Sequence, residues 1–164
     1  MTELEKSMNL TSRIALVGAG VLGVALVPVA ANAHSPQLTD QQRQQIVSRF
    51  ATAIVHDDHR GIIANTTAGV TWTIPGTSAV SGRSVGQNAV LKLADTFAKF
   101  DLTISPRAFA FGVDTVAVEL HDTGSHNGKA LDQDVVNVLT IRDGKVSSLS
   151  GNLADVQAFD AYFS

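Results

Sequence analysis

The chain has 164 residues, a formal net charge of −3 at pH 7 and no cysteine. This mildly acidic balance excludes the basic footprint expected of a nucleic-acid-binding protein, so we predict no nucleic-acid partner. The lack of cysteine excludes a disulfide framework, so the fold depends on packing. Beyond an apolar N-terminal segment, the remaining length suits one domain with its own hydrophobic core.

The N-terminal segment, residues 1–33, has the pattern of an export signal. Residues 14–32 carry no charged side chain, and Ala31-Asn32-Ala33 forms a small-x-small site for signal peptidase. We therefore expect cleavage before His34, a flexible N-terminus over 34–38, and a secreted or extracytoplasmic chain that is free of the membrane. The alternative is an uncleaved anchor, because the uncharged run approaches the length that spans a bilayer.

The residues after this segment, from Thr39 to about Val55, have the apolar spacing of a helix. Thr39 and Gln42 form a capping-box pattern, and apolar residues then recur every three or four positions, which predicts a helix over about 40–55. A short second helix should begin after Asp57 or Asp58, since either side chain can cap it.

A strand and a third helix come next in the sequence. Alternation over 70–74 predicts a strand that ends at Pro75-Gly76. Ser84 and Gln87 repeat the capping-box pattern, and the apolar stripe after them predicts a long third helix.

Two turn dipeptides, Asn127-Gly128 and Asp143-Gly144, connect alternating segments at 115–125, 130–142 and 145–152. Asn-Gly and Asp-Gly favour two-residue type I′ turns, because both central residues there need positive φ. We therefore predict antiparallel hairpins, a short C-terminal helix and an α+β fold.

Two-residue turns also predict which residues face each other across the hairpins. The first turn sets His121 opposite Asp134, and the second sets Asn137 opposite Ser150. One face of the sheet, which we interpret as concave, then gathers apolar side chains around a small polar group: Val116, Val118, Leu120, Val135, Leu139, Ile141 and Val146, with Asn137, Ser148, Ser150 and Asn152.

These motifs resemble the nuclear-transport-factor-2-like superfamily, and within it the SnoaL-like polyketide cyclases and ketosteroid-isomerase relatives. The resemblance assigns a SnoaL-like domain to 39–164 and implies a cone-shaped curved antiparallel sheet, closed by N-terminal helices and a long third helix, as in cystatin-like α+β barrels. It also implies an apolar pocket and a homodimer. The segments that carry it are 70–76, 81–84, 127–132, 142–146 and 155–163.

The resemblance also counts against one chemistry. In ketosteroid isomerases the general base is an aspartate at the end of the first strand, and the matching position here is Ile74. An aliphatic side chain cannot transfer a proton. We therefore keep a non-catalytic binding or sequestering module as the alternative to an enzyme.

The polar group Asn137, Ser150 and Asn152 is the main candidate for ligand recognition. Amide and hydroxyl groups at the floor of an apolar cavity can hold a carbonyl or hydroxyl, with Asn137 and Asn152 as catalytic hydrogen-bond donors. The alternative is that these groups satisfy one another or a buried water. The other predicted ligand-binding residues are Trp72, which is equally plausible as core, and Val118, Leu120, Val135 and Leu139.

His121 opposite Asp134 is the most enzyme-like pair, since a carboxylate can orient an imidazole for general-base catalysis. The pair falls on the face opposite the predicted cavity, where a surface ion pair is the simpler interpretation. His56 and His59, flanked by Asp57 and Asp58, could chelate a divalent ion or form an ordinary polar helix junction. We predict neither a metal nor a cofactor.

The sequence thus predicts an exported pocket protein for a small hydrophobic molecule that bears a carbonyl or hydroxyl. As an enzyme it would catalyse cofactor-independent isomerisation, cyclisation or dehydration. As a binder it would hold the same class of molecule without turning it over.

Overall fold

The computed structural model describes residues 37–164. The predicted signal segment 1–33 and the cleavage site before His34 lie outside the described residues. Among the described residues, no helix has both the length and the apolar character that crossing a membrane requires. The elements are α1 (Asp40–Val55), α2 (His59–Asn65), β1 (Thr66–Ile74), β2 (Gly82–Val85), α3 (Gln87–Phe97), β3 (Leu102–Phe111), β4 (Thr115–His126), β5 (Lys129–Arg142), β6 (Lys145–Leu153) and α4 (Val156–Tyr162).

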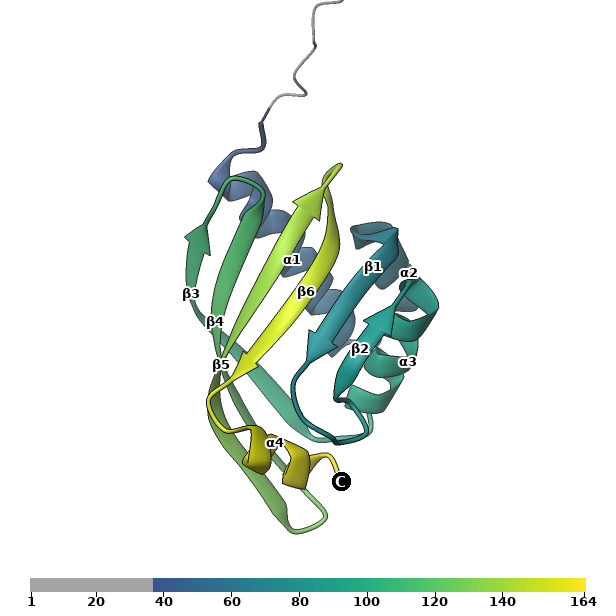
Figure 1. Ribbon diagram of the computed structural model, residues 1–164, viewed down its shortest axis with the longest axis vertical. Coiled ribbons are helices and arrows are strands. Elements are labelled where there is room, and N and C mark those ends of the chain that lie inside the picture. The colour runs from purple at the N-terminus through teal and green to yellow at the C-terminus, as the bar shows by residue number, and fades with distance from the viewer. Residues whose placement is uncertain (1–36) are drawn as a thin grey trace, which may run out of the picture. The chain divides into compact units, whose positions relative to one another are not determined.

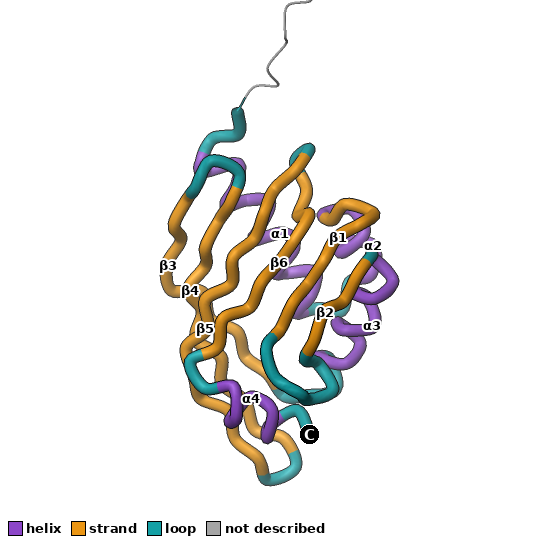
Figure 2. Tube along the Cα trace, viewed as in Figure 1, coloured by secondary structure: helices purple, strands orange, loops and turns teal. Residues whose placement is uncertain are grey.

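The strands form one curved sheet in the order β2-β1-β6-β5-β4-β3. Helices α1, α2 and α3 lie on one side of this layer, and α4 lies at one end of β5 (Figures 1 and 2). The predicted α+β fold with a curved sheet is confirmed. Two details differ from the expectation, because β1 pairs with β6 in parallel and the sheet stays open at β2 and β3 instead of closing into a barrel.

The helix starts follow local capping chemistry. The Thr39 hydroxyl accepts from the Gln42 backbone N–H at 3.2 Å, and the Gln42 side chain accepts from the Thr39 backbone at 2.8 Å, which confirms the capping box of α1. Asp58 caps α2 through the Gly61 N–H. The prediction that Ser84 caps the third helix is wrong. Ser84 lies in β2, where it pairs with Trp72 of β1, and α3 begins after Gly86.

The β4–β5 hairpin has the predicted register. Asn127 and Gly128 both adopt positive φ, at 50° and 78°, and His121 lies opposite Asp134. Val118 likewise faces Asn137. A two-residue turn that matches the strand twist therefore fixed the pairing of both strands along their length.

The β5–β6 hairpin starts in the predicted register and then shifts by one residue. Arg142 pairs with Lys145 as expected, but Ser147 is an extra residue on β6, so Thr140 pairs with Ser148. This β-bulge places Gly151, not Ser150, opposite Asn137. Because side chains alternate along a strand, every residue of β6 beyond the bulge faces the side opposite to the predicted one.

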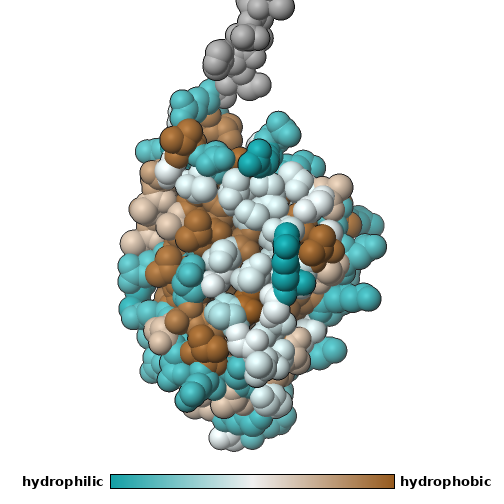
Figure 3. All heavy atoms as spheres, viewed as in Figure 1, coloured by the Kyte–Doolittle hydropathy of each residue, from teal (hydrophilic) through white to brown (hydrophobic). Residues whose placement is uncertain are grey.

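The concave face of the sheet and the helices enclose the hydrophobic core. Three ring pairs cross it, Phe50–Trp72 and Trp72–Phe97 at 5.8 Å and Phe97–Phe163 at 5.5 Å between centroids. The outer face of the sheet, which is turned to the viewer in Figure 3, mixes hydrophobic with neutral and hydrophilic residues. The strands thus bury one face and leave the other half-exposed, as antiparallel sheets commonly do.

Candidate functional site

A cavity of about 320 Å³ lies between α1 and the concave face of β1 and β3–β6, with further walls from α3 and α4. This volume falls in the range of small-molecule pockets. Its wall is mostly apolar, which follows from the alternation of inward-facing residues on the strands. The predicted residues that line it are Trp72, Val118, Leu120, Val135, Leu139 and Asn137, and their role in binding stays a prediction.

Asp122 is a carboxylic acid in this apolar wall. On β4 the inward-facing residues alternate, so Val118 and Leu120 are followed on the same face by Asp122, whose side chain lines the cavity. The residue is only 5% exposed, and its Oδ1 is buried without a hydrogen-bond partner among the described residues.

Burial determines the acidity of Asp122. Removing the carboxylate from water raises its pKa to about 6, against a smaller lowering by His121. A carboxyl with a pKa near neutrality exchanges protons readily in both directions, which is the property of a general acid–base catalyst. Its place in a cavity makes it a functional-site candidate on physical grounds.

Asn137 supplies an amide at a different level of the same wall. It pairs with Val118 on β4 and Gly151 on β6, and a Cβ built on Gly151 would lie 3.4 Å from the Asn137 Oδ1. A Cβ at this position would therefore be in ordinary van der Waals contact with the amide. Asp122 is four residues beyond Val118, so at about 3.4 Å per residue roughly 14 Å of strand separates the two polar groups.

Ser150 and Asn152 are not part of this wall, so their predicted place beside Asn137 is wrong. Both are exposed on the outer face, because the bulge at Ser147 reverses the facing of that part of β6. The Asn152 Nδ2 donates to the Val136 carbonyl at 2.9 Å, so the amide is paired with the backbone of the neighbouring strand β5.

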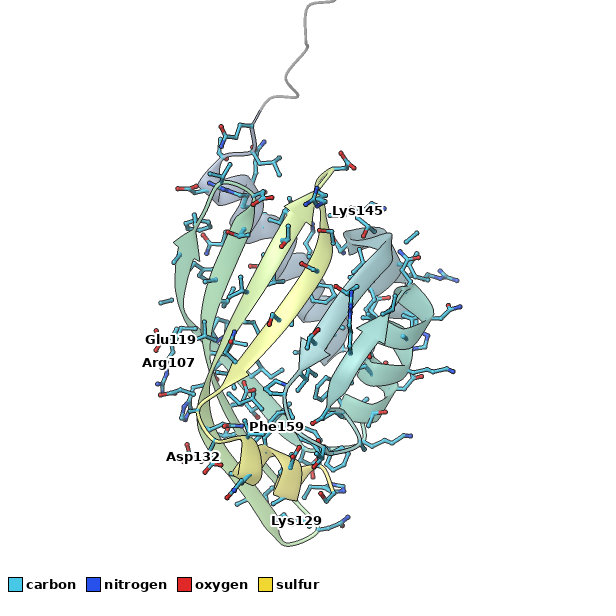
Figure 4. The ribbon with its side chains drawn as sticks, viewed as in Figure 1. Arg107, Glu119, Lys129, Asp132, Lys145 and Phe159 are labelled. Atoms are coloured by element: carbon cyan, nitrogen blue, oxygen red, sulfur yellow. The ribbon has the colours of Figure 1, made fainter. Side chains whose placement is uncertain are left out.

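His121 and Asp134 lie on the outer face, as their register predicted. The His121 Nδ1 is 2.7 Å from the Asp134 Oδ1, and the Arg107 Nη1 is also 2.7 Å from that oxygen. These contacts lower the pKa of Asp134, the His121 hydrogen bond more than the Arg107 charge. Asp132 reaches the other ring nitrogen at 3.1 Å. Figure 4 shows Arg107 and Asp132 on the same side of the molecule.

The polar junction between α1 and α2 separates its two histidines. His56 lines the cavity, whereas the His59 Nε2 lies 2.7 Å from the Asp95 Oδ1 and 3.4 Å from the Asp57 Oδ1. The Asp95 hydrogen bond raises the pKa of His59. The residues weighed as a chelate or a polar helix junction are thus divided, with His56 at the cavity and His59 paired with Asp95 of α3.

Sequence reasoning missed Asp122 and its cross-strand neighbour Gln133. The signal was present, since the alternation that turned Leu120 inward continues to Asp122, and the confirmed register sets Gln133 opposite it. Gln133 is 6% exposed, which is unusual for a long amide side chain. A buried acid opposite a buried amide is therefore a polar feature of the concave face that follows from the hairpin register.

Comparison with known proteins agrees with this architecture. Comparison with curated proteins finds no match. Among solved structures, Bal32a from a soil-derived mobile gene cassette is similar at a TM-score of 0.70 and 20% identity, over 76% of this chain and 98% of that one. A Xanthomonas campestris protein of unknown function with a cystatin-like fold has a TM-score of 0.66 and 27% identity, over 74% and 97%.

A third solved structure has the same fold, and a family model identifies the family. A Jannaschia protein assigned as a SnoaL-like polyketide cyclase is similar at a TM-score of 0.64 and 17% identity, over 79% of this chain and 95% of that one. The sequence model of the SnoaL-like domain matches residues 47–149, which is more than half of the chain. This protein therefore belongs to the SnoaL-like domain family, whose members bind small molecules in a pocket of this kind.

Proposed function

We propose that the protein is a cofactor-independent proton-transfer enzyme acting on a small hydrophobic molecule that bears a carbonyl or hydroxyl. The observation that carries this proposal is Asp122, a buried carboxyl with an unpartnered oxygen in an apolar cavity. The similar Jannaschia protein, assigned as a polyketide cyclase, supports the same reaction class. Isomerisation of an unsaturated ketone, aldol-type cyclisation and loss of water from a β-hydroxy ketone each proceed through removal of a proton beside a carbonyl.

In this reaction the Asp122 carboxylate removes a proton from the carbon next to the carbonyl, and the electron pair moves onto the carbonyl oxygen to form an enolate. The carboxylic acid then returns the proton to carbon or oxygen, so the enzyme ends unchanged. Asn137, at its own level of the wall, donates a hydrogen bond to a second oxygen of the ligand and orients it. The apolar walls exclude water and keep the carboxyl poised near neutral pH.

The test is hydrogen–deuterium exchange of 2-tetralone, a small apolar ketone, followed by NMR in deuterium oxide. We expect the wild-type protein to accelerate exchange at the carbon beside the carbonyl, and Asp122→Asn to reduce that acceleration by roughly 10²- to 10⁴-fold. Fluorescence of Trp72, the one tryptophan, reports binding of the ketone separately. Equal exchange by wild type and Asp122→Asn would remove Asp122 from the chemistry.

The competing function is a non-catalytic binder, which Ile74 favours. It stands where ketosteroid isomerases carry their base, and here it lines the cavity as an inert side chain. A binder would quench Trp72 fluorescence with the ketone and leave exchange at the rate of buffer alone.

We further propose that the protein is exported after cleavage before His34 and forms a homodimer through the outer face of the sheet. The uncharged segment with its Ala31-Asn32-Ala33 ending supports export. N-terminal sequencing of the protein from the host's extracytoplasmic fraction tests it, and a chain that still carries the segment 1–33 would contradict it. The half-exposed outer face, with Val136 at 40% exposure, supports the dimer.

A further inference from the structure

Gln133 has an amide nitrogen for which the structure provides no partner. Its Oε1 accepts a hydrogen bond from the Asp155 backbone N–H at 3.0 Å, which fixes the direction of the amide group. Its Nε2 is shielded from solvent and has no hydrogen-bond partner among the described residues. Buried amide donors are almost always paired, so an unpaired one points to an acceptor close by.

The nearest unpaired acceptor in the register is the Asp122 Oδ1. Gln133 on β5 lies directly opposite Asp122 on β4, and both side chains stand on the concave face. Directly opposed residues have Cβ atoms about 4.5–5.5 Å apart, within the combined reach of a carboxylate and a longer amide. The Asp122 Oδ1 is shielded from solvent in the same way as the Gln133 Nε2.

We propose that Gln133 is the positioning residue of Asp122: the two atoms are unpaired in the structure, and when the carboxylate ionises a rotation of the two opposed side chains brings the Nε2–H to Oδ1, to which it donates. The other carboxylate oxygen is then directed at the ligand. This inference rests on the role of Asp122 given under the proposed function. Gln133 is not part of the cavity wall itself, so it acts through Asp122 and does not touch the ligand.

The arrangement has a mechanical and an electrostatic consequence. Asp155 also caps α4, because its Oδ1 accepts from the Ala158 N–H at 2.9 Å, so the amide is anchored to the start of a helix. A hydrogen bond to the charged form favours ionisation and opposes the effect of burial. The charged group that acts on Asp122 is His121, its neighbour on β4, and His56 lines the same cavity from the end of α1.

The pair can be tested in the wild-type protein by NMR. We expect one Gln133 side-chain amide proton to move downfield as the pH rises, with the same midpoint as the Asp122 carboxyl carbon. Asp122→Asn should abolish that movement. If the chemical shifts of the Gln133 amide protons do not change as Asp122 titrates, the proposal is overturned, and this result needs no variant at Gln133.

Variants measure the size of the effect. Gln133→Leu should raise the midpoint of Asp122 by about one pH unit or more, because the ionised form loses its donor. Asn137→Leu, which removes a different amide from the wall, should leave that midpoint where it is. A folded Gln133→Leu protein with an unchanged Asp122 midpoint would refute the pairing.

The pH profile of 2-tetralone exchange separates this inference from the proposed function. If both hold, Gln133→Leu moves the profile to higher pH by the same amount as the NMR midpoint. If Asp122→Asn leaves exchange unchanged while the amide still follows the Asp122 titration, the pair is structural and the proposed function fails by itself.

Discussion

The two faces of the β4–β5 hairpin each carry an aspartate, and the environments of these two carboxylates differ. Asp122 faces the cavity, is buried without a hydrogen bond to a described residue, and has its pKa raised to about 6. Asp134 faces outward, contacts His121 and Arg107, and has its pKa lowered. His121 and Asp122 are adjacent in sequence, yet the pleat sends them to opposite sides.

The difference shows why a hydrogen-bonded His–Asp pair is a poor guide to function by itself. His121 and Asp134 have the short distance of a catalytic pair, but their charges compensate each other in water, where such pairs contribute little. Asp122 has no such partner, and desolvation instead moves its pKa toward neutrality. The reactive group of this sheet is therefore expected where partners are scarce and the surroundings are apolar.

The largest expected effect comes from truncating Leu149, the β6 side chain that the bulge at Ser147 turns into the core. With the bulge, Leu149 lies opposite Leu139 and is 5% exposed, whereas Ser150 lies on the outer face. Leu149→Ala should therefore cost roughly 2–5 kcal/mol of the free energy of unfolding, measured by urea denaturation. Ser150→Ala is the control and should change that free energy by less than about 0.5 kcal/mol. Equal stability of the two variants would contradict the bulge, because Leu149 would then face outward.

This bulge also marks the limit of what the sequence predicts. The α1 bounds, its capping box and the β4–β5 register follow from local rules, because a cap or a two-residue turn is decided by adjacent residues. The facing of Ser150 and Asn152 depends on one extra residue at Ser147, whose sequence carries no glycine or other bulge signal. The bulge is instead explained by packing, because an extra residue at this position places Leu149 in the core.

The candidate site was predictable to a similar extent. Four apolar lining residues and Asn137 follow from alternation and register, Trp72 follows from the family resemblance, and Asp122 follows from the same alternation continued by two residues. Its raised pKa does not follow from sequence, because it depends on burial by distant elements such as α1 and α4.

The second prediction uses pH to separate the two aspartates. The folded pKa of Asp122, about 6, exceeds the unfolded value of 3.8, so the folded state holds its proton longer and stability falls as pH rises from about 4 to 6. The loss amounts to about 3 kcal/mol, and Asp122→Asn should recover it at pH 8 but gain nothing at pH 3.

Asp134→Asn is the matched control on the outer face. The folded pKa of Asp134 is lowered, so its contribution is present above the unfolded pKa and is lost as the pH falls below it. This variant should therefore be slightly less stable than wild type at pH 8. Thermal unfolding across the pH range measures both variants, and a stabilising Asp134→Asn with a neutral Asp122→Asn would reverse our assignment of the two environments.

The third prediction compares two asparagines on opposite faces. Asn137→Leu removes an amide from the cavity and should weaken binding of 6-hydroxy-2-tetralone, a ketone that carries a second oxygen, by up to about tenfold, the value of one net hydrogen bond. Asn152→Leu makes the same chemical change on the outer face and should leave binding unchanged. Titration of Trp72 fluorescence measures both. Equal affinities for the two variants would mean that the Asn137 amide makes no contact with the ligand.

The smallest expected effect on stability belongs to Val136, which is 40% exposed between Glu119 on β4 and Asn152 on β6. Val136→Lys should change the free energy of unfolding of one protomer by less than about 0.5 kcal/mol, because a half-exposed site has little packing to lose. Sedimentation velocity should nevertheless show a shift from dimer to monomer, since two lysines would face each other across a two-fold contact.

Ile63→Lys provides the comparison that makes this result interpretable. Ile63 is 44% exposed, close to Val136 in accessibility, but it lies on α2 and not on the sheet. Its replacement should leave the oligomeric state unchanged. If both variants stay dimeric, the outer face is not the contact and its apolar residues are ordinary surface. If both variants become monomeric, the dimer contact includes the helical side of the molecule and is not confined to the outer face of the sheet.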